Sequence, residues 1–341
     1  MKLPPPPPEP VFHVLPLGGH GGGAEAPSEP PPAAEIAGML DGLDDTRGPV
    51  WVDVARTHPR ARDVLRSLGI TDDITLDALL MQETRPRAWS EGEALVAFLR
   101  GVNLNADARP EDMISVRVWM TRDRLVTLRV FRVMALESSA ERVRTGRGEG
   151  STTATLLDLI RGLTERLEST IEGLEAQVLE TEQALSEQSH SEGPGERLRL
   201  APIRRKVVML RRYVSPQRDL LTQLSSSRFT AWFTEDDREQ LRELESRQAR
   251  LVEELDELRE RAQVLIEEAH AAAGHKMAQT SYVLTVVAAL FLPLGFLTGL
   301  LGVNVGGIPG VEEPTAFWVL CGLMVLLVVA QMVVFRWRKW L

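Results

Sequence analysis

Two long apolar runs near the C-terminus constrain this chain more than any other feature. They extend from Tyr282 to Leu301 and from Ala316 to Phe335, and neither contains Asp, Glu, Lys, Arg or His. Each has about the 20 residues that a helix needs to cross the hydrocarbon layer of a bilayer. A buried helix of a soluble protein is the alternative for a single run, but two runs in tandem favour a membrane protein with two spans.

Charged residues beside the runs predict the orientation of the spans. Lys276 precedes the first run and Arg336 and Arg338 follow the second, whereas the loop between them contains Glu312 and Glu313 and no basic residue. Cytosolic loops of membrane proteins are enriched in Lys and Arg. We therefore expect a multi-pass protein of the cell (inner) membrane with both termini in the cytoplasm. Two helices cannot enclose a water-filled path, so a transport function requires several copies around an axis.

The loop between the runs is rich in residues that suit tight backbone packing, which an inert membrane anchor does not need. It opens with Gly302-Val303-Asn304 and continues through Gly306-Gly307-Ile308-Pro309-Gly310. With the preceding segment from Phe291 to Gly299 and the terminal Lys339-Trp340-Leu341, it resembles the CorA family of divalent-cation transporters, whose signature is a G-M-N-type triplet after the first span. The G-V-N variant followed by V-G-G-I-P-G is more similar to the zinc-transporting ZntB branch than to the magnesium-transporting branch.

Two cytosolic segments are also similar to the ZntB branch, so the resemblance covers most of the chain from about residue 50 onward. They are Glu83-Thr84-Arg85-Pro86-Arg87 and the stretch from Met209 to Asp219. A helix end before Pro86 with salt-bridging partners explains the first segment as well as a regulatory role does. The resemblance implies an α+β/α membrane protein: a cytosolic α/β domain, a long helical stalk bundle and two C-terminal transmembrane helices, assembled as a homopentamer. It implies Zn²⁺ as the transported ion and no cofactor.

Charge and cysteine content exclude several other classes. The net charge is −9, which argues against a nucleic-acid partner and suits a surface that gathers cations. The single cysteine, Cys321, lies inside the second run. No intramolecular disulfide can therefore form, and a cysteine-based zinc site within one subunit is excluded.

The segment 1–32 is rich in Pro and Gly, and we expect most of it to be disordered. Val11 to Leu17 is the exception and predicts an edge strand. The start of the chain contains no apolar core of signal-peptide length, so this end is expected to stay in the cytosol. His13 and His20 could gather a metal ion, but scattered histidines in a flexible segment bind nothing in most proteins.

Residues 33–150 are predicted to form the cytosolic α/β domain. Strands are expected at 50–54, 95–101, 115–121 and 125–130, and helices at 59–68 and 71–81. Val116, Val118 and Met120 alternate with Arg117 and Trp119, which predicts a half-buried strand followed by a hairpin turn at 121–124. The domain has no phosphate-binding Gly-rich loop, nucleophile elbow or paired-histidine metal motif, so we expect no enzymatic activity.

Residues 151–275 are predicted to form a bundle of long helices. Helical spacing predicts helices at 151–191 and 196–224, with Pro216 kinking or ending the second one locally. A third helix carries an apolar seam of residues three and four apart, as in a coiled coil. The seam consists of Leu241, Leu244, Gln248, Leu251, Leu255, Leu258, Ala262, Leu265, Ala269 and Ala272. It can pack inside one subunit, around an oligomer axis, or both at different ends. This helix is expected to run on into the first span as a stalk of roughly 90 to 100 Å.

Continuing the seam periodicity into the pore domain, 276–341, selects one face of the first span. That face comprises Ser281, Leu284, Ala288, Leu292, Gly295 and Gly299, with Gly302, Val303 and Asn304 at the mouth. These positions match the pore-lining face of the family. Leu284 and Leu292 would form apolar rings that gate by dewetting. Gly295 and Gly299 fit close helix packing in lipid equally well.

The expected ion chemistry follows from what the spans lack, namely a set of Cys, His or carboxylate ligands that could strip Zn²⁺ of its water. We therefore expect the ion to pass hydrated. In the implied pentamer, a ring of Asn304 amide oxygens would accept hydrogen bonds from the ion's waters, while Glu312 and Glu313 would concentrate cations at the rim. The spans also lack ionisable groups for a proton relay, so any pH response should come from Glu312 and Glu313 or from His270 and His275.

Zinc and magnesium are not separated by these features, and the zinc assignment rests on the resemblance. Two alternatives stay open. One is a magnesium, cobalt or nickel channel of the same family, and the other is a non-transporting, membrane-anchored coiled-coil scaffold.

Overall fold

A computed structural model of the chain describes residues 11–17, 48–82, 85–148, 150–187, 197–225, 232–302 and 313–338. The chain forms two compact units, 1–266 and 267–341. The domain boundaries expected at 32, 150 and 275 remain predictions. His20 lies outside the described residues.

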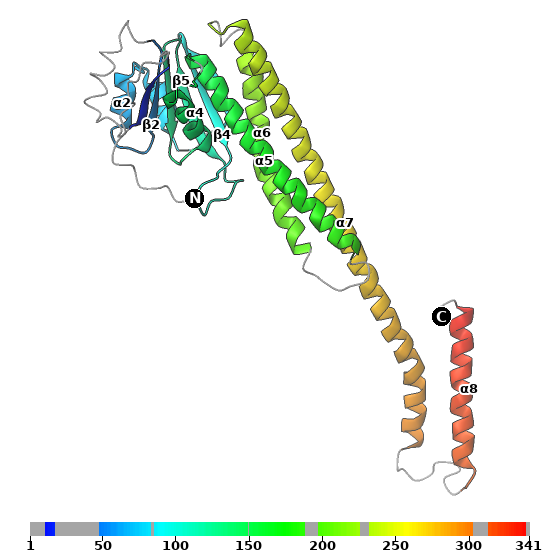
Figure 1. Ribbon diagram of the computed structural model, residues 1–341. Coiled ribbons are helices and arrows are strands. Elements are labelled where there is room, and N and C mark those ends of the chain that lie inside the picture. The colour runs from blue at the N-terminus through cyan, green and yellow to red at the C-terminus, as the bar shows by residue number, and fades with distance from the viewer. Residues whose placement is uncertain are drawn as a thin grey trace. The chain divides into compact units, whose positions relative to one another are not determined.

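The first unit is built on a six-stranded sheet in the order β1-β2-β6-β5-β4-β3 (Figure 1). β2 and β6 are parallel, and the other neighbouring strands are antiparallel. The predicted edge strand is confirmed as β1, and the predicted hairpin turn is closed by the Thr121 N–H, which donates to the Arg124 carbonyl (2.8 Å). The strands are β1 (Val11–Pro16), β2 (Val50–Ala55), β3 (Arg87–Glu91), β4 (Ala94–Gly101), β5 (Ile114–Met120) and β6 (Arg124–Arg129).

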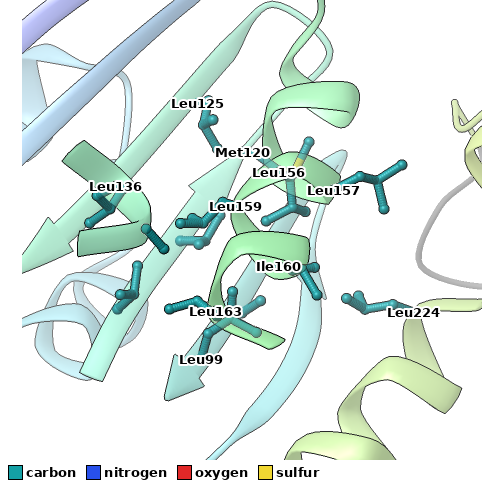
Figure 2. Close-up of a cluster of buried hydrophobic side chains, with 14 of the residues drawn as sticks. Leu99, Met120, Leu125, Leu136, Leu156, Leu157, Leu159, Ile160, Leu163 and Leu224 are labelled. Atoms are coloured by element: carbon teal, nitrogen blue, oxygen red, sulfur yellow. The ribbon is translucent and has the colours of Figure 1, made fainter. Parts of the chain in front are cut away.

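Helices cover both faces of this sheet. The apolar side chains of α2 and α3 pack with Val52, Val96 and Val126 on one face, and those of α4 and α5 pack with the other. Figure 2 shows the second core, in which Leu159 and Leu163 of α5 lie close to strand residues. The helices are α2 (Ala61–Ser67), α3 (Asp73–Leu80), α4 (Met134–Arg144) and α5 (Thr152–Glu187).

The prediction that β5 is half-buried is wrong. Trp119 is 6% exposed and Arg117 only 1%, because α2 and α3 cover the face that the alternation assigned to solvent. The Arg117 guanidinium donates to the carbonyl oxygens of Ala78, Leu79 and Met81 at the C-terminal end of α3. The last carbonyl groups of a helix lack intrahelical donors and favour a cation, so this arginine can be buried.

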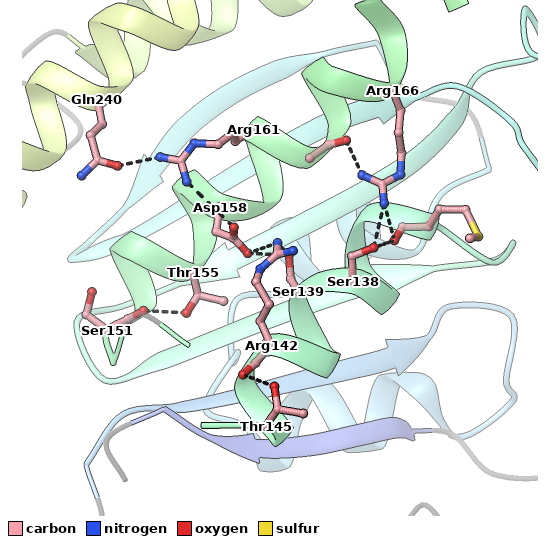
Figure 3. Close-up of polar contacts among 12 residues, drawn as sticks. Ser138, Ser139, Arg142, Thr145, Ser151, Thr155, Asp158, Arg161, Arg166 and Gln240 are labelled. Carbon is pink, nitrogen blue, oxygen red and sulfur yellow. Dashed lines mark hydrogen bonds and ion pairs between the residues drawn. The ribbon is translucent and has the colours of Figure 1, made fainter. Parts of the chain in front are cut away.

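Two more long helices belong to the first unit, the second of them only up to residue 266. Polar contacts at a constant sequence separation show the relative direction of α5 and the last helix. Arg247 forms an ion pair with Glu168, and Arg161 donates to Gln240, each pair being 79 residues apart (Figure 3 includes the second). The equal sequence separation of the two pairs means that α5 and the part of α7 beside it run in the same direction. The helix between them in the sequence, α6, runs in the opposite direction. The long helices are α5, α6 (Arg197–Ser225) and α7 (Glu235–Leu301).

The seam of the third helix is buried inside this one chain. Its residues from Leu241 to Leu265 are 0–6% exposed and lie among apolar side chains of α5 and α6. Ala272 is exposed, so the buried seam does not extend that far. The packing within one subunit therefore accounts for the coiled-coil spacing of 241–265.

Pro216 lies inside α6, which continues to Ser225, so the alternative in which this proline ends the helix is wrong, and a local kink stays a prediction. Buried side chains anchor the helix on both sides of the proline: Val214 and Gln217 are 0% and 2% exposed. The Gln217 Oε1 accepts a hydrogen bond from the N–H of Arg100 in β4 (2.6 Å). Tertiary contacts thus offset the backbone hydrogen bond that proline removes.

Candidate functional site

The two apolar runs form the candidate site, and both lie in helices of the length and composition that cross a membrane. The first is the C-terminal part of α7, which continues without interruption to Leu301, as predicted. The second is α8 (Ala316–Trp337). Large apolar side chains such as Leu292, Phe296 and Trp318 are 68–74% exposed within the chain. Exposed apolar surface of this kind suits a lipid environment or a protein interface.

One side of the first span packs toward α8. Its half-buried residues recur three and four apart and comprise Val286, Ala289, Leu290, Pro293, Leu294 and Leu297. On α8 a matching stripe of half-buried residues comprises Leu320, Cys321, Met324, Leu327, Val328 and Gln331. This spacing is that of a helix with one buried side, so the second unit is a helical hairpin.

The predicted pore-lining residues centre on the opposite side of the first span, although Gly295 also lines a cavity beside Met324 and Val328 of α8. Ser281, Leu284, Ala288, Leu292, Gly295 and Gly299 are all exposed in the chain. At 3.6 residues per turn, their positions centre about half a turn away from the side that packs toward α8. A Cβ atom added at Gly295 or Gly299 would meet nothing within 4 Å, so neither glycine serves close helix packing within this chain. No side chain of the described residues covers these two glycine positions.

The predicted mouth is described only in part. Gly302 ends the helix, with its N–H donating to the Thr298 carbonyl (2.9 Å), and a Cβ at this position would lie 2.8 Å from that same oxygen. A side chain at 302 would require the backbone to shift, which accounts for glycine there. Val303, Asn304 and Glu312 lie outside the described residues, and Glu313 is exposed.

Polar groups are sparse within the spans. The hydroxyls of Thr285 and Thr298 donate to carbonyls of their own helix, Ser281 O at 2.7 Å and Leu294 O at 3.0 Å. Gln331 of α8 instead reaches the other helix, where its Nε2 donates to the Ala289 carbonyl (3.3 Å). Sequence reasoning missed this contact, although a lone amide in an apolar run was a signal that could have found it.

The described residues contain no group of three or more His, Cys, Asp or Glu side chains placed to hold a metal ion. His270 and His275, at the approach to the first span, are exposed on α7. The described part of the chain thus offers no dehydrating site for Zn²⁺, which needs three or four such ligands.

The two segments outside the apolar runs that support the resemblance contact the sheet of the first unit where the structure describes them. Glu83 and Thr84 lie outside the described residues, while Arg87 begins β3 and stacks 5.1 Å from the Trp89 ring centroid. In the second segment, Tyr213 lies 4.7 Å from the Arg100 guanidinium. Gln217 binds the backbone of the same residue, so this segment docks α6 onto the end of β4.

A buried polar network in the first unit was not predicted. The Asp53 carboxylate is fully buried and accepts hydrogen bonds from Thr127 Oγ1 (2.6 Å) and Arg129 Nε (2.7 Å). Arg129 also pairs with Glu137 (2.6 Å), and burial works against the two carboxylates, which together raise the pKa of this arginine. Because its charges are paired within the fold, removing one member of the network would leave an uncompensated buried charge.

Comparison with known proteins adds independent information. A family model described as "CorA-like Mg2+ transporter protein" matches residues 46–338. The chain is 37% identical over 326 residues to the divalent cation transporter CmaX of Pseudomonas aeruginosa, with 95% of each chain covered. It is 32% identical over 302 residues to the zinc transport protein ZntB of Yersinia pseudotuberculosis, with 89% of this chain and 91% of the relative covered.

Solved structures extend the likeness to the fold. Full-length CmaX is similar with a TM-score of 0.79 at 34% identity, with 97% of this chain and 98% of that chain covered. The CorA magnesium transporter of Methanocaldococcus jannaschii is similar with a TM-score of 0.73 at 18% identity, with 88% and 95% covered. At that identity the second likeness concerns the fold alone.

Proposed function

Since this chain belongs to the CorA-like Mg²⁺ transporter family, we propose that it conducts divalent cations across the cytoplasmic membrane through a pore lined by α7, with Zn²⁺ import as its activity. The observation that carries the proposal is the uncovered side of α7. Side chains from Ser281 to Gly299 on that side are exposed, while the opposite side packs toward α8. In this proposal the chain is not an enzyme, and the metal ion is its cargo.

A homopentamer would enclose the pore. Several copies of the α7 face are needed because one helical hairpin cannot surround a hydrated ion. The residues of that face, Ser281, Leu284, Ala288, Leu292, Gly295 and Gly299, would then line the path. Leu284 and Leu292, which are 69% and 70% exposed in the single chain, would form its apolar constrictions.

The ion would cross with its water shell. The described residues supply no ligand set for a bare ion. We propose that Gly302, Val303 and Asn304 form the mouth, where amide oxygens of Asn304 bind the waters of the ion. Glu312 and Glu313 would raise the cation concentration at the rim, and basic residues beyond the spans would keep both termini in the cytoplasm.

Support for zinc comes from the ZntB relative, whose name states that ion. Magnesium is the second candidate, because the description of the matching family names Mg²⁺. Flux of radiolabelled Zn²⁺ and Mg²⁺ into liposomes that contain the full-length chain tests the two ions side by side. Faster zinc uptake supports the proposal. Faster magnesium uptake would mean that Mg²⁺ and not Zn²⁺ is the transported ion, and no uptake of either ion favours a scaffold.

The mouth is tested by Asn304→Ala in the same liposomes. The substitution removes a polar acceptor without burying a charge, so the oligomer should remain intact while flux falls. Size-exclusion chromatography in detergent checks the oligomer. Wild-type flux in this variant would contradict the assignment of the mouth.

Proton coupling is tested by zinc uptake with and without an inward proton gradient. If a gradient stimulates uptake, the effect should be lost in the double variant His270→Gln with His275→Gln or in Glu312→Gln with Glu313→Gln. Stimulation that survives in both double variants would place the coupling group elsewhere. No stimulation in the wild type would favour a passive channel for hydrated ions.

A further inference from the structure

Pro293 interrupts the hydrogen bonding of the first span. In an α-helix each carbonyl accepts the N–H of the residue four positions later, and proline has no N–H to donate. Pro293 lies inside α7, so the carbonyl of Ala289 has no partner of this kind. In a bilayer core no water is available for such a group, and neighbouring helices or polar side chains must satisfy it.

Gln331 of α8 satisfies this carbonyl. It is the single Asn or Gln in the two apolar runs, and its Nε2 lies 3.3 Å from the Ala289 oxygen. Its Oε1 is buried without a hydrogen-bond partner among the described residues. The Gln331 amide therefore donates to the Ala289 carbonyl, the one carbonyl of the first span whose helical donor is removed by a proline.

A cavity adjoins both helices on the loop side of this contact. Its lining includes Leu294, Gly295 and Thr298 of α7 with Met324 and Val328 of α8. The segment of α7 that follows Pro293 thus has space beside it, whereas the contact at Ala289 ties the helices together just before the break. A proline within a helix is the usual place for it to bend.

We propose that Gln331 is a positioning residue that latches α8 to the proline break of α7 and so sets the direction of the segment 294–302. That segment carries Gly295 and Gly299 of the predicted pore face, so the consequence for ion flux rests on the proposed function. The latch itself does not, because it is a contact within one helical hairpin.

A double-mutant cycle separates the latch from ordinary packing. Gln331→Met keeps the length and volume of the side chain and removes the donor. Pro293→Ala restores an N–H for the Ala289 carbonyl, which makes the Gln331 donor redundant. Equilibrium unfolding of the full-length protein in mixed micelles of SDS and a mild detergent is measured for the wild type, both single variants and the double variant.

Gln331→Met should shift the unfolding equilibrium about 3- to 20-fold toward the unfolded state, the range found for hydrogen bonds between membrane helices. In the Pro293→Ala background the same substitution should have little effect. Thr298→Val, which removes a hydroxyl that bonds within its own helix, is the control and should cost the same in both backgrounds. If Gln331→Met lowered the stability equally in both backgrounds, or in neither, the proposed latch would be refuted.

Ion flux into liposomes then tests the positioning role. Gln331→Met should change the flux rate, and adding Pro293→Ala should not deepen that change. A coupled unfolding cycle with wild-type flux in every variant would overturn the positioning role. If the wild type itself carries no ion, the proposed function fails, while the unfolding cycle still decides whether the latch exists.

Discussion

A buried histidine in β1 should make the first unit sensitive to acid. His13 is 7% exposed, and its ring packs edge-on against Trp51 with ring centroids 4.7 Å apart. Its Nε2 has no hydrogen-bond partner among the described residues. Burial lowers the pKa of His13 from 6.5 to about 4, against the attraction of Asp53 in β2 and with the repulsion of Arg129 in β6. The charged groups of α4 that face it act in opposite directions, Arg144 lowering the pKa and Glu137 raising it.

The sign of the effect follows from proton uptake. The unfolded chain binds a proton at His13 near pH 6.5, whereas the folded chain does not until about pH 4. Stability associated with neutral His13 is therefore complete above pH 6.5 and is lost as the pH falls toward 4. At about 1.4 kcal/mol per pKa unit, the loss approaches about 3 kcal/mol at pH 4 and is about 2 kcal/mol at pH 5.

His13→Phe isolates this contribution. Phenylalanine keeps a ring against Trp51, and the Nε2 that it removes has no partner to lose. Urea unfolding of the full chain in detergent, followed by circular dichroism between pH 7.5 and 4.5, gives the free energy of unfolding for each protein. The difference between wild type and His13→Phe should widen steadily below pH 6.5. His275→Gln, which replaces an exposed histidine of α7, should keep the wild-type profile. Parallel curves for wild type and His13→Phe would refute the reasoning.

Three further predictions concern the first unit. Leu255→Asp with Leu258→Asp places charges at positions that are 0% and 5% exposed, which should lower the free energy of unfolding by several kcal/mol in urea titrations, whereas Val264→Asp, at a 51% exposed position of the same helix, should not. Asp53→Asn leaves Arg129 buried with only Glu137 as a charged partner and should lower the free energy of unfolding by about 3 to 5 kcal/mol in urea titrations; a loss below about 1 kcal/mol would contradict the importance of the pair. Gln217→Leu removes the acceptor of the Arg100 N–H and should cost about 1 to 3 kcal/mol in the same titrations, and an unchanged midpoint would contradict that role.

Elements with a strong repeating pattern were predictable from the sequence. The seam from Leu241 to Leu265 and the two apolar spans carry a helical or charge-free signal that needs no knowledge of partners. β3 and α4 were not predicted, because R-A-W-S-E has one large apolar side chain and α4 carries Ser139 at a buried position. That serine can be buried because its Oγ donates to Asp158 of α5 (2.7 Å; Figure 3), a contact made only in the folded chain.

Within the candidate site, too, one part was predictable from the sequence and another was not. The exposed positions from Ser281 to Gly299 could be selected by extending a period along one helix, while their pore-lining role stays a prediction. Gln331 could not be matched to Ala289 by such a period, since the two lie 42 residues apart on different helices. Arg117 was misjudged for a related reason: its burial depends on the carbonyl groups at the end of α3, which the alternation within β5 does not report.

The contact between Gln217 and Arg100 also bears on self-association. Within the described ranges, β3 pairs with β4 only as far as Phe98, so Arg100 lies beyond the paired part of that edge. An open backbone donor at a sheet edge invites a strand from another molecule. The Gln217 side chain of α6 occupies the position that such a strand would use. A backbone group of α6 could not do so, because it is already hydrogen-bonded within the helix. A chain that is refolding before α6 has docked would therefore be at its most prone to aggregate through this edge.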